Sequence, residues 1–213
     1  GLSFMLGVMR IINLAHGSLT VVAAYLLWVL AEPMGWHPML ALLAVVPAMA
    51  LLGWLLHKLV LERSARLGAL VPLLATFGLA SVIDNVLFQH FGADTRSLAT
   101  SIGTLAYDSW ELPGGLYVGQ LPTLVLVLAV LLLGGLHAML AHTALGRQIR
   151  AASEDADTAR LVGVRTGTVF AAASAITMVT VTLAGASLAL RATFDPFSGP
   201  QQLIFAFEAV IIG

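Results

Sequence analysis

The sequence contains no cysteine among its 213 residues. This absence excludes disulfide frameworks, thiol nucleophiles and cysteine-based zinc sites. Charge is also scarce, because Asp, Glu, Lys and Arg make up only 10% of the chain, against roughly 25% in an average soluble domain. The formal net charge is −1, so no strongly basic face suggests nucleic acid as a partner. The composition therefore argues against both a soluble domain and a nucleic-acid-binding protein.

What the chain has in place of charge is apolar sequence. Hydrophobic residues make up 59% of it, the mean hydropathy is +0.96, and several runs reach the roughly 20 apolar residues that a spanning helix needs. The runs are too long and continuous for the alternating strands of a membrane barrel. We therefore predict an all-α, polytopic integral membrane bundle. Full spans are expected at about 18–31, 38–57, 70–89, 121–142 and 167–190, with partial segments at about 1–12 and 201–213.

Both ends of the sequence fall inside apolar stretches. The chain begins with Gly1 rather than Met, and it stops at Gly213 with no polar tail. We expect one transmembrane domain over 1–213 that is incomplete at both ends and belongs to a longer protein.

The basic residues predict the orientation of the spans. Seven of the ten Lys and Arg residues fall in two connections, 57–71 and 143–166, and the positive-inside bias assigns such loops to the cytoplasm. Segment 90–120 has one Arg, and connection 32–37 has none. Both are expected on the outer side.

Two apolar segments are interrupted by Gly or Pro beside polar residues, the first at 13–18 and the second at 195–200. Asn13 and His16 are costly in hydrocarbon unless they meet partners or water, so such a break usually lines a cavity. Paired interruptions of this kind point to the substrate path of a transporter. The alternative is that 13–17 forms an ordinary cytoplasmic turn, with Arg10 placed by the positive-inside bias.

If a helix begins at Ser18, its first N–H groups carry partial positive charge toward the break and favour a passing carboxylate. Two carboxylates, Asp84 and Glu208, also lie within apolar spans, where ionisable groups are functional candidates by default. We rank Glu208 above Asp84, which would equally suit the outer end of its helix. The predicted substrate path consists of Asn13, His16, Gly17, Ser18 and Glu208.

Segment 146–163 carries too many charges to span a membrane, yet its pattern is helical. A stripe of small and apolar residues recurs at spacings of three and four, and Arg150 and Glu154 form an i,i+4 pair. The stripe consists of Ile149, Ala152, Ala156, Ala159 and Gly163. It indicates either a helix that inserts into a groove of a partner protein or an amphipathic helix that rests on the chain's own membrane ends.

Four blocks, in order along the chain, resemble one known family. They are Asn13 to Gly17, which reads Asn-Leu-Ala-His-Gly; Leu61 to Arg63; the run from Thr143 to Val164; and Pro200 to Gly213. Together they resemble permease subunits of branched-chain amino-acid ABC importers of the LivH type.

This resemblance implies an all-helical permease that imports branched-chain amino acids through the bacterial inner membrane. The implied partners are ATP-binding subunits, a second permease subunit, an external substrate-binding protein and membrane lipid, with no cofactor or metal. It also implies that 143–166 couples to the ATPase, with Arg150, Glu154, Asp155, Ala159 and Gly163 as candidate contacts. The same family includes importers of urea and short amides, so the substrate stays open at this point.

Other functional classes are less consistent with the sequence. An intramembrane metallohydrolase would need a pattern such as His-Glu-x-x-His, and the six His residues are scattered instead. There is no Walker A motif or Gly-x-Ser-x-Gly elbow, so ATP hydrolysis would belong to a partner and the chain itself is not expected to be an enzyme. An ATP-independent carrier or channel remains an alternative, although it would have no use for a coupling segment.

Overall fold

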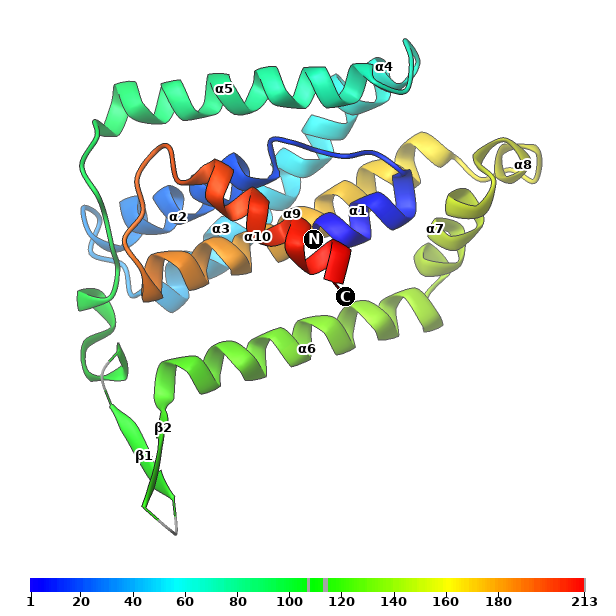
Figure 1. The fold of residues 1–213 in the computed structure, drawn as a ribbon. Coiled ribbons are helices and arrows are strands. Elements are labelled where there is room, and N and C mark those ends of the chain that lie inside the picture. The colour runs from blue at the N-terminus through cyan, green and yellow to red at the C-terminus, as the bar shows by residue number, and fades with distance from the viewer. Residues whose placement is uncertain (107, 113–114, 213) are drawn as a thin grey trace.

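The computed structural model describes residues 1–106, 108–112 and 115–212. Its architecture is a bundle of helices (Figure 1), which confirms the predicted fold class. Four helices are long and apolar enough to cross a membrane, and the helix that begins at Pro38 continues to Ala65 by this measure. The apolar helices are α1 Leu2–Met9, α2 His16–Ala31, α3 Pro38–Leu56, α5 Val71–Phe91, α6 Gln120–His142, α9 Thr166–Arg191 and α10 Gly199–Ile212. Each coincides with an expected span, with shifts of a few residues at the ends.

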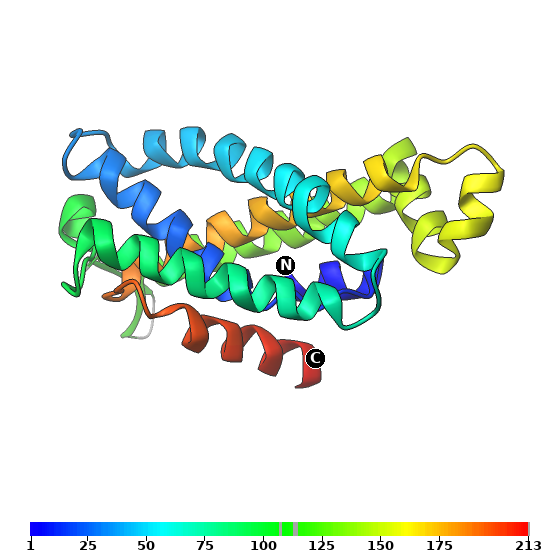
Figure 2. The same ribbon diagram turned by 90° about the horizontal axis from the view of Figure 1, so that it is seen from above.

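Both basic connections lie at the same end of the bundle, as the charge pattern predicts. The first connection contains a π-helical turn, η1 His57–Leu61, and α4 Glu62–Ala65, and the second contains α7 Ala144–Glu154 and α8 Ala156–Leu161. Figures 1 and 2 both show α7 and α8 projecting beyond the ends of the long helices. We call this the basic end of the bundle.

The opposite end carries the connection between α5 and α6. It contains a 3₁₀ segment, η2 Thr100–Ala106, and an antiparallel hairpin of β1 Ser109–Leu112 and β2 Leu116–Gly119, in which Trp110 pairs with Val118. No strands were expected, because the prediction considered only the long apolar runs. Of the turn-rich stretch 112–115, Pro113 and Gly114 lie outside the described residues.

The core forms where α2, α3 and α9 approach one another closely. A Cβ added at Gly185 of α9 would lie 2.6 Å from the carbonyl oxygen of Thr20 in α2 and 2.8 Å from the Cβ of Ala23. Gly53 of α3 meets α9 in the same way, with the carbonyl oxygen of Ser174 2.6 Å from its added Cβ. Small residues at such crossings are typical of membrane bundles, where close packing replaces the hydrophobic effect as the source of helix association.

Helix α6 lies apart from this core. Its apolar side chains, including Leu126 and Leu131, are exposed, and an apolar cavity of about 540 Å³ separates it from α3 and α9. At its end α6 turns directly into α7, and the side chain of Thr143 accepts a hydrogen bond from the Gly146 N–H at 3.0 Å. Gly146 lies against the carbonyl groups of α6, leaving no room for a Cβ. The α6–α7 junction is therefore a tight elbow.

Candidate functional site

The two interruptions predicted from the sequence meet in the structure. Gly17, in the first turn of α2, lies against the carbonyl group of Gly199, the first residue of α10, so closely that a Cβ on Gly17 would overlap that carbonyl. In the reverse direction, a Cβ added at Gly199 would lie 2.9 Å from both the backbone nitrogen and the hydroxyl oxygen of Ser18. The beginnings of two helices that are far apart in the sequence thus touch through their backbones.

The segment between α1 and α2 runs back into the bundle from the basic end (Figure 1). Arg10 terminates α1 in the left-handed conformation, with φ of 54°, and lines a cavity together with Arg66 and Arg160 of the basic end. Farther along, the Leu14 N–H donates a hydrogen bond to the Thr76 hydroxyl of α5 at 3.1 Å. Arg10 therefore lies at the basic end, as the turn hypothesis expects, whereas the residues after it return to the interior.

Asn13 stabilises the turn that leads from this segment into α2. Its side-chain oxygen accepts a hydrogen bond from the Ala15 N–H at 3.0 Å, and its carbonyl oxygen accepts one from the His16 N–H at 3.3 Å. Because these bonds organise the first turn, α2 begins at His16 and not at Ser18 as expected. Asn13 is 0% exposed, so the segment is not the solvated turn that the alternative describes.

Several polar atoms at this junction are buried without partners. The Asn13 side-chain nitrogen and the His16 Nδ1 belong to this group among the described residues. The His16 ring lies close to Gly1 and to Thr180 of α9. A Cβ added at Gly1 would be 3.0 Å from the His16 ring and 2.5 Å from the Thr180 hydroxyl oxygen. An unpaired buried polar group costs about 1–3 kcal/mol. The Asn13 side-chain nitrogen and the His16 Nδ1 are therefore free to bond a further polar group at the junction.

The two candidate carboxylates occupy different environments. Asp84 of α5 is only 9% exposed, and one of its carboxylate oxygens is buried without a hydrogen-bond partner among the described residues. Glu208 is exposed on the surface of α10. Asp84 is thus an interior group of α5, about two turns after Thr76, whose hydroxyl bonds the Leu14 N–H. Glu208 stays outside. We call Asn13, His16, Ser18, Thr76 and Asp84 the junction site.

The second predicted site, over 146–163, is two helices and not one. The chain breaks at Asp155, which has an extended conformation and caps α8 by accepting hydrogen bonds from the backbone N–H groups of Asp157 and Thr158 at 2.9 and 3.1 Å. The hydroxyl of Thr158 donates a third bond to the same carboxylate at 2.5 Å. These bonds lower the pKa of Asp155 below its usual value.

The small-residue stripe of this segment faces the chain's own helices. Ile149, Ala152 and Ala159 are buried at 1%, 3% and 3% exposure, and the first two belong to one cluster with Val8 and Val169. Of the two interpretations of the stripe, packing against the chain's own helices therefore describes these residues. The Arg150 guanidinium donates to the carbonyl oxygen of Leu140, and no ion pair joins it to Glu154 within the described part of the chain.

What the segment exposes instead is an apolar tip at the end of α8. Leu161 and Val162 are 87% and 75% exposed, and Gly163 follows with φ of 89°, a conformation that suits glycine. The periodicity analysis missed these two residues, since they lie off the stripe. Their signal in the sequence was a pair of adjacent large apolar residues directly before a glycine, in an otherwise charged segment.

Neither site is arranged to bind a metal. Within the described residues no group of three or more His, Asp or Glu side chains is close enough to hold one. The junction site offers hydroxyls, an amide, an imidazole and one carboxylate, which suits hydrogen bonding to a small polar molecule better than covalent chemistry.

Comparison with known proteins supports a transport role. A profile of the family described as the permease component of the branched-chain amino acid transport system matches residues 1–213. The chain is also similar to BraD of Pseudomonas aeruginosa, a high-affinity branched-chain amino acid transport system permease protein. The two are 22% identical over 223 residues, which cover 100% of this chain and 72% of BraD. No solved structure matches the chain significantly.

Proposed function

The chain belongs to the family of branched-chain amino acid transport system permease components, and from this premise we propose that it is the permease subunit of an ABC importer. It is a multi-pass membrane protein and a transport subunit, not an enzyme. The proposed activity is movement of branched-chain amino acids into the cytoplasm, driven by ATP that separate subunits hydrolyse. The proposed location is the bacterial inner membrane, with the basic end of the bundle in the cytoplasm according to the positive-inside bias.

The contact between Gly17 and Gly199 is the observation that carries the proposed substrate path. Broken helices that meet inside a bundle present half-helix ends to a ligand. Here the starts of α2 and α10 adjoin buried Asn13 and His16 atoms that have no hydrogen-bond partner in the part of the chain that the structure describes. In this proposal, the Gly17–Gly199 contact closes the path. When α2 and α10 separate, the Asn13 amide, the imidazole of His16 and the first N–H groups of α2 become available to a substrate carboxylate.

Around the polar groups of the junction site, the proposed path is lined by apolar side chains. The walls around the junction are apolar residues such as Leu203, whose Cβ lies 3.0 Å from an added Cβ on Gly17. An aliphatic side chain of a substrate finds apolar contacts there, while its polar end finds the junction site. This pairing favours leucine-like substrates over urea, which has no aliphatic part.

Coupling to ATP hydrolysis is proposed to use α7 and α8. The tip of Leu161 and Val162 projects at the basic end, and exposed apolar residues in a charged segment mark an interaction surface. The occupant we propose is an ATP-binding subunit. Arg150, Glu154, Asp155 and Gly163 are exposed and flank the proposed contact. Ala159 is buried and supports the tip from inside. A second permease subunit and an external substrate-binding protein complete the proposed assembly.

Uptake by the complete transporter tests this proposal. The full-length permease that contains this chain is reconstituted in liposomes with its ATP-binding subunits and binding protein, and labelled leucine, urea and acetamide are offered in turn. We expect leucine accumulation that requires ATP on the side of the basic end. Accumulation of urea or acetamide but not leucine would assign the alternative substrate class. Leucine uptake without ATP would instead identify an ATP-independent carrier.

A further inference from the structure

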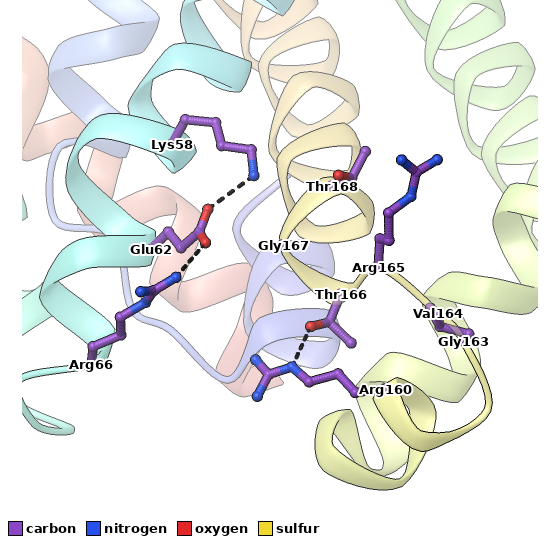
Figure 3. A pocket seen from close by; sticks show the side chains of 10 residues that line it. All are labelled: Lys58, Glu62, Arg66, Arg160, Gly163, Val164, Arg165, Thr166, Gly167 and Thr168. Atoms are coloured by element: carbon purple, nitrogen blue, oxygen red, sulfur yellow. Dashed lines mark hydrogen bonds and ion pairs between the residues drawn. The ribbon is translucent and has the colours of Figure 1, made fainter.

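A cavity of about 690 Å³ opens at the basic end, between η1 and α4 on one side and the start of α9 on the other (Figure 3). Both basic connections contribute to its lining. Four of the lining side chains are cationic, namely Lys58, Arg66, Arg160 and Arg165, and one is a carboxylate, Glu62. We call it the basic cavity.

The ion pairs of the basic cavity leave an excess of positive charge. Glu62 pairs with two cations. One of its carboxylate oxygens is 3.0 Å from the Lys58 ammonium, and the other is 2.9 Å from the Arg66 guanidinium. Arg160 pairs with Asp157 at 3.0 Å and also donates to the Thr166 hydroxyl at 2.8 Å. Two carboxylates therefore face four cations, and Arg165 has no ion pair among the described residues. An anion entering the cavity meets uncompensated positive charge.

The first turn of α9 forms one wall of the cavity. Thr166, Gly167 and Thr168 line it, and the positive end of a 26-residue helix adds to the charge of the arginines. A Cβ added at Gly167 would lie 3.1 Å from a Glu62 oxygen, so the absence of a side chain there keeps the helix start close to the charged cluster.

A second cavity, of about 350 Å³, adjoins the first and differs in character. It shares Glu62, Arg66, Arg160 and Gly167 with the basic cavity and continues toward α1 and α5. Its remaining lining is mainly apolar and includes Met9, Ile11, Leu61, Pro72 and Phe170. The two cavities together have a charged mouth and an apolar interior.

His57 lies in the wall of this second cavity with unused hydrogen-bonding groups. It begins the π-helical turn η1, is 2% exposed, and both of its ring nitrogens lack a partner within the described residues. Single π-helical turns within longer helices occur frequently at functional sites. A buried imidazole with no partner is costly, which indicates that a polar group of a ligand belongs beside it.

We propose that the two cavities hold an anionic phospholipid of the cytoplasmic leaflet. The phosphate lies in the basic cavity beside Arg66 and Arg160, at the start of α9, and Arg165 adds positive charge from the other side of that helix start (Figure 3). The glycerol esters reach His57, and the first part of an acyl chain lies along Leu61 and Phe170. Basic pockets between transmembrane helices on the cytoplasmic side bind anionic lipid headgroups, and the apolar second cavity fits an amphipathic ligand rather than an acidic side chain of a partner protein.

Lipid retention by the purified transporter tests this inference. The full-length permease in complex with its ATP-binding subunits is delipidated in detergent and then offered phosphatidylglycerol, phosphatidylcholine or inorganic phosphate. Native mass spectrometry counts the adducts retained per permease copy. Thr168→Glu places a carboxylate at the mouth of the cavity, on an exposed position in the first turn of α9 where an acidic residue is favourable to the helix. Arg165→Gln removes the cation that has no ion pair.

The matched control is Gln148→Glu, which adds the same charge on the exposed face of α7, outside both cavities. We expect phosphatidylglycerol to be retained in preference to phosphatidylcholine by the wild type and the control. Retention should fall roughly fivefold in Arg165→Gln and at least as much in Thr168→Glu, the effect of one charge near an anionic lipid surface. Equal retention of the two lipids, or equal retention in all variants, would overturn the inference.

Two further outcomes would assign the cavity to another ligand. Displacement of phosphatidylglycerol by inorganic phosphate alone, at millimolar concentration, would identify an anion site without a lipid tail. Loss of phosphatidylglycerol whenever the ATP-binding subunits are present would identify the cavity as a seat for an acidic residue of that partner. Either result contradicts a lipid site in the assembled transporter.

Discussion

Gly17 and Gly199 touch backbone to backbone, so that neither helix start can carry a side chain toward the other. Gly17→Ala introduces a Cβ that overlaps the Gly199 carbonyl, and α2 and α10 must then separate. Overpacking of this kind costs about 1–3 kcal/mol. We expect a lower midpoint of thermal unfolding for the full-length permease in detergent, measured by circular dichroism.

Gly134→Ala provides the control for that change. Gly134 is exposed on α6, and an added Cβ there meets nothing within 4 Å. Ala is favoured over Gly in a helix by about 0.5–1 kcal/mol, so this variant should unfold at the same temperature or slightly higher. A similar midpoint for both variants would show that the helix starts do not need the glycine contact.

Asn13→Ala and His16→Ala should cut leucine uptake while leaving assembly with the ATP-binding subunits intact. Each removes a group that we assign to the substrate path and that has an unpartnered atom in the closed structure. We expect a decrease of more than about tenfold in the uptake rate, corresponding to a loss of about 1.4 kcal/mol or more. His90→Ala, at an exposed position near the end of α5, should transport normally. Normal uptake in both junction variants would remove them from the path.

Leu161→Asp should abolish stimulation of the ATPase by loaded binding protein. The side chain is 87% exposed and has no role in the core, so a charge there disturbs a partner contact and not the fold. Leu67→Asp makes the same change at a 77% exposed position in the other basic connection and should keep full stimulation. Equal stimulation in the two variants would place the coupling contact elsewhere.

Impermeant thiol labelling on intact cells tests the orientation. The chain has no cysteine, so single cysteines can be introduced at exposed positions without background. We expect Thr95→Cys to react and Gln148→Cys to react only after permeabilisation, because the α5–α6 connection and α7, to which they belong, lie at opposite ends of the bundle (Figure 1). The reverse pattern would invert the topology.

The cap of α8 should respond to acid. Hydrogen bonds from Thr158 and from backbone N–H groups lower the pKa of Asp155, so its contribution to stability is complete above the usual Asp pKa and disappears as the pH falls through the lowered value. Hydrogen exchange of 156–161, corrected for intrinsic rates, should accelerate on acidification in the wild type. Asp155→Ala, which removes both acceptor oxygens, should show weaker protection at neutral pH and little further change on acidification. Identical profiles would exclude the cap.

The spans and the interruptions could be predicted because hydrocarbon permits few alternatives. A long apolar run must satisfy its own backbone groups as a helix, and Gly or Pro beside polar residues at 13–18 and 195–200 marks where that helix stops. The contact between the two interruptions could not be predicted. Helix α2 is buried on almost every side, so its sequence has no polar face to reveal which neighbour each residue meets.

The burial of Asp84 and the exposure of Glu208 could not be predicted for a related reason. Both are single carboxylates in apolar runs, and only the rotation of each helix decides which one faces the interior. The stripe containing Ile149 and Ala152 shows the converse limit. Its periodicity correctly indicated a buried helix face. The same residue pattern is expected, however, whether a partner protein or the chain's own helices bury that face. Only packing against Val8 and Val169 distinguishes the two.

The elbow at Thr143 also gives the molecule a mechanical linkage. Because Gly146 and Arg150 both contact the last turn of α6, α6 and α7 rotate together as one angled rod. A helix of 23 residues is about 34 Å long at 1.5 Å per residue, so a tilt of about 5° at the elbow displaces its far end by about 3 Å. A small push on α7 is thereby amplified into a sideways swing of Gln120, at the opposite end of the bundle.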